Sequence, residues 1–110
     1  MEGTSSSTIV ADPSAIAVNT SAVGIDQFSI NDVRTAKYVI SVSRGSQYQA
    51  TEAMLVHNGT QTQLVTYADL YTGNALMTFS ANINSSIVTL YGTGSGSGNA
   101  VKLQKTYVKV

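Results

Sequence analysis

Apolar and polar side chains alternate along most of this 110-residue chain, and short clusters of Gly, Asn and Ser interrupt the alternation. The clearest run is "AKYVISVSR", in which Tyr38, Ile40 and Val42 share one face and the intervening residues share the other. A period of two residues is typical of a half-buried β-strand. From residue 21 onward the pattern predicts about seven strands, at residues 21–30, 36–44, 48–58, 61–71, 75–83, 87–92 and 100–110.

The Asn58-Gly59 pair separates two of these runs. Both residues tolerate positive φ, so Asn-Gly between alternating segments is a strong hairpin signal. We therefore expect residues 48–58 and 61–71 to form a hairpin with this pair at its tip. On the first strand, Ala53, Leu55 and His57 should lie on one face.

No segment of the chain shows a convincing helical period, and the connections between the expected strands are short, which implies antiparallel pairing. Strands at this spacing with Gly and Asn turns favour a sandwich or a barrel. The predicted fold is an all-β, antiparallel, jelly-roll-like β-sandwich of about seven strands; a small β-barrel is the alternative.

The last strand changes its alternation partway along. Val101 and Leu103 share one phase, whereas Thr106, Val108 and Val110 share the other. We expect a one-residue slip or bulge near Gln104–Lys105. The lysines on this terminal strand, Lys102, Lys105 and Lys109, are expected to protect a sheet edge from aggregation.

Residues 1–20 differ from the rest of the chain, because Pro13 interrupts their apolar stretch and cannot donate to a sheet ladder. We expect an extended N-terminal arm or edge strand here; a short helix after Asp12-Pro13 is the weaker option. The β-sandwich domain would then comprise residues 21–110. The apolar residues of the arm could complete the sheet of a neighbouring subunit by strand addition; they are Ile9, Val10, Ile16 and Val18.

Charged residues make up only 11% of the chain and the net charge is zero, against about 25% charged residues in ordinary soluble domains. Nucleic acid and anionic membranes attract clustered Lys and Arg, so neither is an expected partner. Weak charge lets copies of the chain lie side by side with little repulsion. Cysteine is absent, which excludes disulfides and thiolate metal sites.

We find no catalytic constellation. His57 is the single histidine and is expected simply to end a strand. The glycine-serine segment 94–98 matches a nucleophile elbow in letters only, since no helix follows it. Glu52 and Asp69 would not lie opposite each other in the hairpin, and the carboxylates are expected to be solvated. The chain is thus predicted not to be an enzyme and to hold no cofactor or metal.

Tyrosine is the commonest aromatic residue, with six copies. Tyrosines on a β-surface suit half-buried sheet positions and can also stack on sugars or bases. Tyr67, Tyr71 and Tyr91 are the candidate ligand-facing residues.

Several clusters of residues appear in a familiar order between residues 34 and 73. They are Arg34, Ala36, Lys37, Tyr38, Tyr48, Gln49, Thr51, Glu52, Val56, His57, Asn58, Gly59, Tyr67, Thr72 and Gly73. With this series, segment 34–110 resembles a module of virion structural proteins from marine tailed phages, especially myovirus-type cyanophages. The chain departs from that module after Asn84, where "NSSIVTLYG" replaces a Gly-Gly turn and an Arg-containing strand.

The resemblance implies a non-enzymatic structural role in a virion, on the head, neck or tail. It also suggests cross-strand ion pairs among Arg34, Lys37 and Glu52 beneath the hairpin tip. The leading hypothesis is therefore a capsid-decorating or neck-, tail- or fibre-associated module that assembles with other virion proteins and with copies of itself, a trimer being compatible. The alternative is a carbohydrate- or receptor-binding module of a phage fibre, with a host-surface glycan as ligand. A hydrolase is the least favoured reading.

Overall fold

The computed structural model describes residues 7–11 and 15–110. These residues form nine β-strands and no helix, so this part of the chain contains no helix long and apolar enough to cross a membrane. The strands are β1 (Ser7–Ala11), β2 (Ile16–Val18), β3 (Val23–Ser29), β4 (Val33–Arg44), β5 (Gln47–His57), β6 (Thr62–Tyr71), β7 (Met77–Asn84), β8 (Ile87–Gly94) and β9 (Asn99–Lys109).

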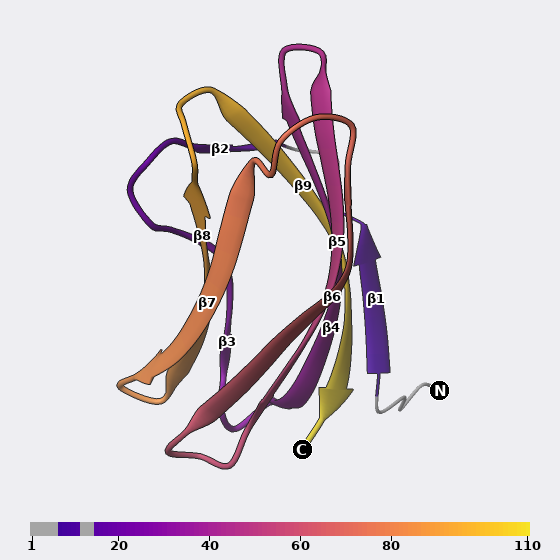
Figure 1. The fold of residues 1–110 in the computed structure, drawn as a ribbon. Helices are drawn as coiled ribbons and strands as arrows, with labels where there is room; N and C mark the ends of the chain where they lie inside the picture. Colours follow the sequence, from indigo (N-terminus) through magenta and orange to yellow (C-terminus); the bar gives the residue numbers. More distant parts are fainter. Residues whose placement is uncertain (1–6, 12–14) are drawn as a thin grey trace.

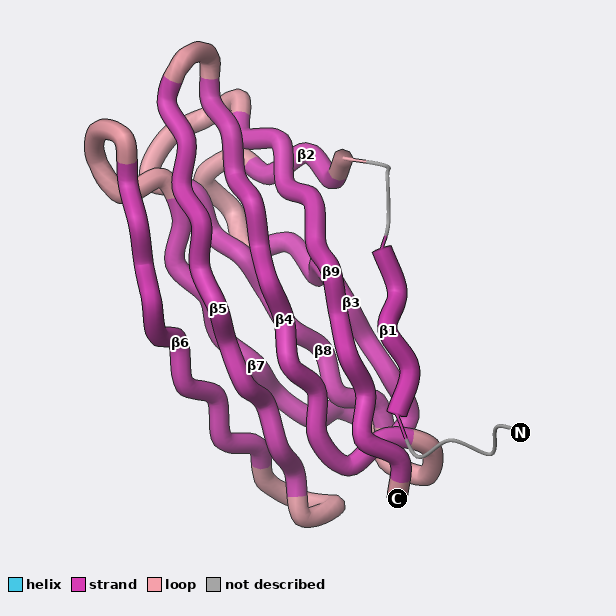
Figure 2. Tube along the Cα trace, turned by 90° about the vertical axis from the view of Figure 1, so that its right-hand side faces the viewer, coloured by secondary structure: helices cyan, strands magenta, loops and turns pink. Residues whose placement is uncertain are grey.

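The strands form two antiparallel sheets that pack face to face (Figure 1). The large sheet has the order β1-β9-β4-β5-β6, with β2 also paired to β9, and the small sheet has the order β3-β8-β7. Figure 2 looks onto the large sheet, in which β4, β5 and β6 follow one another as a meander. The predicted antiparallel sandwich is confirmed. Because the two sheets are separate, the fold is not the small β-barrel that was the alternative.

All seven predicted strands are present, as β3 to β9. The two additional strands lie in the segment expected to be an arm, and both pair with β9 of the same chain. β2 is part of the sandwich, because Ile16 pairs with Val101 and the Val18 side chain is fully buried in the core. β2, which falls within the predicted arm (residues 1–20), thus packs with the predicted sandwich domain (residues 21–110). Residues 1–6 and 12–14, including Pro13, lie outside the described residues.

The hydrophobic core lies between the two sheets. Alternation places the side chains as expected: Tyr38, Ile40 and Val42 of β4 are fully buried. Ala53, Leu55 and His57 of β5 are buried as well. The small sheet contributes Phe28, Val88 and Leu90, among others.

A buried amide joins the two sheets at one end of the sandwich. Gln49 of β5 is 2% exposed, and its Oε1 accepts hydrogen bonds from the main-chain N–H groups of Leu76 (2.7 Å) and Met77 (3.0 Å). Its Nε2 donates to Thr51 Oγ1 and to the Met77 carbonyl. These four bonds satisfy the buried side chain and fix the start of β7 against β5.

The predicted β5–β6 hairpin is confirmed, but its loop has four residues, 58–61, between the paired residues His57 and Thr62. Gly59 has φ of 97°, whereas Asn58 does not adopt positive φ. The Asn58 side chain instead accepts bonds from the main-chain N–H groups of Thr60 and Gln61. Asn-Gly therefore acts here through side-chain capping of the loop as well as through glycine's conformational freedom.

The bulge predicted near Gln104–Lys105 is wrong, because β9 pairs with β4 in continuous register through these residues. The shift in this ladder lies in β4, between Val33 and Thr35. β9 is also an interior strand with neighbours on both sides, so its lysines do not protect an edge. The alternation changes in the sequence because Lys105 occupies an inward-facing position, in phase with Val101 and Leu103.

Candidate functional site

The inward-facing polar residues of the sandwich centre on Asp26 of β3. The β3–β8 register shifts between Gly24 and Asp26, which places Asp26 opposite the core residue Leu90. A β-bulge of this kind redirects a side chain to the other face of the sheet. The Asp26 side chain therefore points between the sheets and is only 6% exposed.

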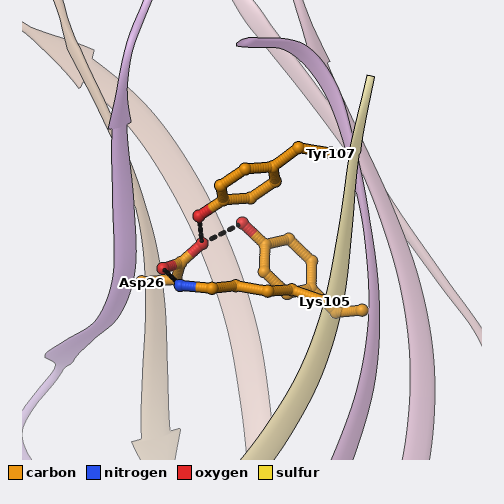
Figure 3. Close-up of polar contacts among 4 residues, drawn as sticks. Asp26, Lys105 and Tyr107 are labelled. Atoms are coloured by element: carbon orange, nitrogen blue, oxygen red, sulfur yellow. Dashed lines mark hydrogen bonds and ion pairs between the residues drawn. The ribbon is translucent and has the colours of Figure 1, made fainter. Parts of the chain in front are cut away.

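Three donors from the large sheet surround this carboxylate (Figure 3). Lys105 Nζ of β9 lies 2.7 Å from Asp26 Oδ1. The Tyr107 hydroxyl donates to Oδ2 at 2.6 Å, and the Tyr38 hydroxyl of β4 donates to the same oxygen at 2.8 Å. We call these four residues the Asp26 cluster; it connects the small sheet to two adjacent strands of the large one.

Burial keeps both tyrosines of the Asp26 cluster as neutral donors. It raises the pKa of Tyr38 far above its ordinary value, and the nearby Asp26 charge and hydrogen bond raise it further. Burial likewise raises the pKa of Tyr107, with the Asp26 hydrogen bond as the next cause. A carboxylate that accepts three charge-assisted bonds from its own protein is suited to holding two sheets in register.

The sequence interpretation missed this cluster, because Asp26 was expected to be solvated and Lys105 to lie on an edge. One signal was available. Extending the alternation of Val101 and Leu103 without a slip places Lys105 and Tyr107 on the inner face, where a buried ammonium needs a carboxylate partner.

His57 ends β5, as predicted, and is 3% exposed. Its Nε2 contacts the Val33 carbonyl, and its Nδ1 accepts a hydrogen bond from the Gly59 N–H at 3.0 Å. These partners assign the proton to Nε2. Because both ring nitrogens are engaged by main-chain groups, His57 holds the hairpin loop to β4.

The ion pairs suggested beneath the hairpin form in part. Lys37 Nζ lies 3.8 Å from Glu52 Oε1, and both side chains are substantially exposed. Arg34 donates instead to the His57 carbonyl oxygen at 3.0 Å. An exposed pair of this kind contributes little to stability.

Glu52 and Asp69 lie on opposite faces of the large sheet. Asp69 Oδ1 accepts a bond from the buried Thr51 hydroxyl at 2.8 Å, whereas Glu52 shares the outer face with Lys37. These two carboxylates therefore cannot act on one substrate. Within residues 7–11 and 15–110, no three or more His, Asp or Glu side chains gather as metal ligands.

The three candidate ligand-facing tyrosines do not form one platform. Tyr67 pairs with Glu52 on the outer face of the large sheet, and a bulge at Ala68 (φ 56°) then reverses the phase of β6. Tyr71 consequently pairs with Gln49 on the inner face and is 46% exposed at the edge. Tyr91 lies on β8, out of phase with the buried Leu90, and so faces outward on the small sheet.

The two outer faces of the sandwich differ in chemistry. On the small sheet, Tyr91 is surrounded by uncharged polar residues of β7, β8 and β3; they are Gln27, Thr78, Ser80, Asn82, Thr89 and Thr93. The outer face of the large sheet exposes apolar side chains; they are Val39 (43% exposed), Tyr48 (52%), Met54 (42%), Val56 (42%), Val65 (56%) and Leu70 (68%). The outer face of the small sheet is thus polar and uncharged, whereas that of the large sheet carries exposed apolar side chains beside the Lys37–Glu52 pair.

The four arm residues divide between two strands. Ile9 and Val10 lie in β1, paired with Thr106 and Lys105 of the same chain. Ile16 and Val18 lie in β2, where Val18 is buried. A role for these residues in assembly stays a prediction; within the chain, their strands complete the large sheet beside β9.

No protein-family model matches this chain, and no curated protein sequence matches it significantly. Among solved structures, the chain is similar to part of the tailspike protein of Acinetobacter phage vB_ApiP_P1, with a TM-score of 0.54 and 14% sequence identity. The similarity covers 99% of this chain and 22% of the tailspike chain. At this identity it shows a shared fold, over a module that spans about a fifth of the tailspike.

Proposed function

We propose that this chain is a non-enzymatic structural module of a phage virion, associated with the tail and acting by binding neighbouring proteins and copies of itself. One observation carries the proposal: nearly the whole chain, 99%, has the fold of a segment of a phage tailspike protein. The resemblance of residues 34–110 to virion modules, found from different features, supports the same assignment.

The surface chemistry supports a role in assembly. Zero net charge and few ions minimise repulsion between neighbouring subunits. Contiguous exposed apolar side chains on a sheet face are typical of protein–protein contacts. The part of the large sheet's outer face formed by Met54, Val56 and Val65 has this character.

The internal chemistry supports a scaffold role over a catalytic one. Asp26 is occupied by three protein donors, and both His57 ring nitrogens bond to the main chain. A general base or nucleophile needs a lone pair that can reach a substrate. Asp26 and His57 use their lone pairs for bonds within the protein.

Locating the chain in the particle tests the proposal. Antibodies against the purified chain, applied to phage particles that encode it, should label the tail under the electron microscope. Mass spectrometry of the same purified particles should detect the chain at a fixed copy number. The proposal fails if the chain is abundant in infected cells but absent from purified particles.

Binding of a host-surface carbohydrate is the second candidate function, and the outer face of the small sheet favours it. An aromatic ring among hydroxyl and amide side chains can stack on a sugar while its neighbours donate and accept hydrogen bonds. Tyr91 has this setting. Glycan-array binding that disappears in Tyr91→Ala and persists in Tyr48→Ala, on the opposite outer face, would support it; unchanged binding in both would exclude Tyr91.

The position of the module within the particle, a trimeric state and an origin in a marine cyanophage stay predictions from the sequence. Labelling of the head instead of the tail would contradict the proposed tail association and favour a capsid-decorating role. Analytical ultracentrifugation of the purified chain would measure the oligomeric state.

A further inference from the structure

Strand β6 forms an outer edge of the large sheet. Among the described strands it pairs only with β5, and it lies at the end of the sheet opposite β1 (Figure 2). In the hairpin loop, the Asn58 N–H donates to the Gln61 carbonyl. Hydrogen-bonded and non-bonded pairs alternate along an antiparallel ladder, so the main-chain N–H and C=O groups of Thr62, Leu64 and Thr66 point away from β5.

These outward-pointing main-chain groups are available. No hydrogen bond among residues 7–11 and 15–110 engages them; the Thr62 hydroxyl contacts the Ala81 carbonyl, but that bond uses the side chain. A row of unpaired groups on a sheet edge is a template for another strand.

The half of this edge next to the hairpin loop lacks the usual protection against such pairing. Natural edges carry Lys, Pro or inward-pointing charges that prevent strand addition. The segment from Thr62 to Ala68 contains no proline and no residue charged at neutral pH. The Ala68 bulge and the inward-pointing charge of Asp69 protect only the far half of β6.

The adjoining outer surface is apolar. Val65 is 56% exposed, and beside it on β5 lie Met54 and Val56, each 42% exposed. Together with Thr35 and Gln63 these residues line a shallow hollow of about 260 Å³. A strand added at β6 would extend this surface and cover part of it.

We propose that the β6 edge binds the β6 strand of a second copy of this chain, antiparallel and about a two-fold axis, to form one continuous sheet through both copies. Centred on Leu64, this pairing joins Leu64 to its counterpart and Thr62 to Thr66 of the second copy. It rests on the proposed assembly function and names the partner strand.

The absence of charge makes this edge compatible with pairing to its own copy. A two-fold axis places a strand against itself, so any charge near the axis meets the same charge, and like charges across a ladder are destabilising. The segment Thr62–Ala68 carries none, and the whole chain is neutral. The uncharged face of Gln63, Val65 and Tyr67 therefore meets its own copy without repulsion.

Thr66→Pro tests the pairing. The Thr66 N–H points to the free edge, so proline removes a donor for the second copy without breaking the β5–β6 ladder. Thr66→Ala, which retains the N–H, is the matched control. Sedimentation equilibrium from low micromolar to sub-millimolar concentration should show dimers for the wild type and Thr66→Ala. The dimer dissociation constant of Thr66→Pro should rise about tenfold or more, since each half of the interface loses one hydrogen bond.

Circular dichroism shows whether Thr66→Pro folds. If it does not, a pair of variants with opposite charges at position 65 tests the same contact. Val65→Lys and Val65→Glu should each weaken self-association, because position 65 lies diagonally across from its counterpart. An equimolar mixture of the two variants should restore association. A wild type that stays monomeric, a dimer equally stable in Thr66→Pro and Thr66→Ala, or a mixture that stays monomeric would each overturn the pairing. Labelling of phage particles decides the virion assignment separately, whatever the result here.

Discussion

Asp26→Asn is the sharpest test of the cluster between the sheets. The substitution preserves the shape of the side chain and removes its charge. It leaves Lys105, whose side chain is 22% exposed, beside a neutral amide where a carboxylate oxygen lay 2.7 Å away. The two tyrosine hydroxyls retain an acceptor, because the Asn oxygen can take the position of Oδ2.

The expected cost follows from the burial of the pair. Two unit charges at the observed 2.7 Å attract by roughly 6 kcal/mol at an effective dielectric constant of about 20, and the cost of desolvating both ions offsets much of this. Removing one partner of a buried pair typically costs about 3–5 kcal/mol. Because the tyrosines keep their acceptor, we expect Asp26→Asn to lower the free energy of unfolding by about 3 kcal/mol. That is a large share of the roughly 5–15 kcal/mol by which a domain is stable.

Urea unfolding at neutral pH measures this effect, followed by circular dichroism and by tyrosine fluorescence, since the chain has no tryptophan. Lys105→Met should cost less, about 1–3 kcal/mol, because Asp26 keeps two tyrosine donors. In the double variant the two losses should fall short of additivity by about 1 kcal/mol or more. A loss below about 1 kcal/mol for Asp26→Asn, or strict additivity, would refute the view that this ion pair holds the sheets together.

Three further outcomes are expected. Below pH 10, the ordinary tyrosine pKa, Tyr38 and Tyr107 are protonated in both the folded and the unfolded chain; above it only the unfolded chain loses these protons. Stability should therefore fall as the pH rises past 10, by up to about 1.4 kcal/mol per pH unit for each tyrosine, and urea titrations should show a shallower decline for Tyr38→Phe. Gln49→Ala should cost about 2–4 kcal/mol in the same assay, because it leaves buried N–H groups at the start of β7 without acceptors; a cost near zero would contradict the assigned bonds. Gly94→Ala should lower the thermal unfolding midpoint clearly, since its Cβ would lie 2.5 Å from a main-chain oxygen, whereas Gly73→Ala, with 3.4 Å to its nearest neighbour, should be mild.

Strand positions and strand faces were predictable because they are local properties. Side chains of a strand point alternately to its two faces, so the phase of Tyr38, Ile40 and Val42 already separates core from surface. Turn chemistry likewise located the β5–β6 hairpin at Asn58-Gly59. The length of the loop, four residues, was harder to predict. The Asn58 side chain accepts bonds from the main-chain N–H groups of Thr60 and Gln61, which stabilises this loop in place of a tight two-residue turn.

The sequence by itself determined the class of the fold, seven of its strands and the faces that most of them bury. The tertiary structure alone decided that Asp26 and Lys105 point inward, because these residues are 79 positions apart and neither explains the other until the sheets pack. Within β9 alone, Lys105 at an inward-facing position looks like a break in the alternation. The packed structure shows that its ammonium group pairs with Asp26 of the opposing sheet. The same holds for β1 and β2, whose partner β9 lies at the far end of the chain.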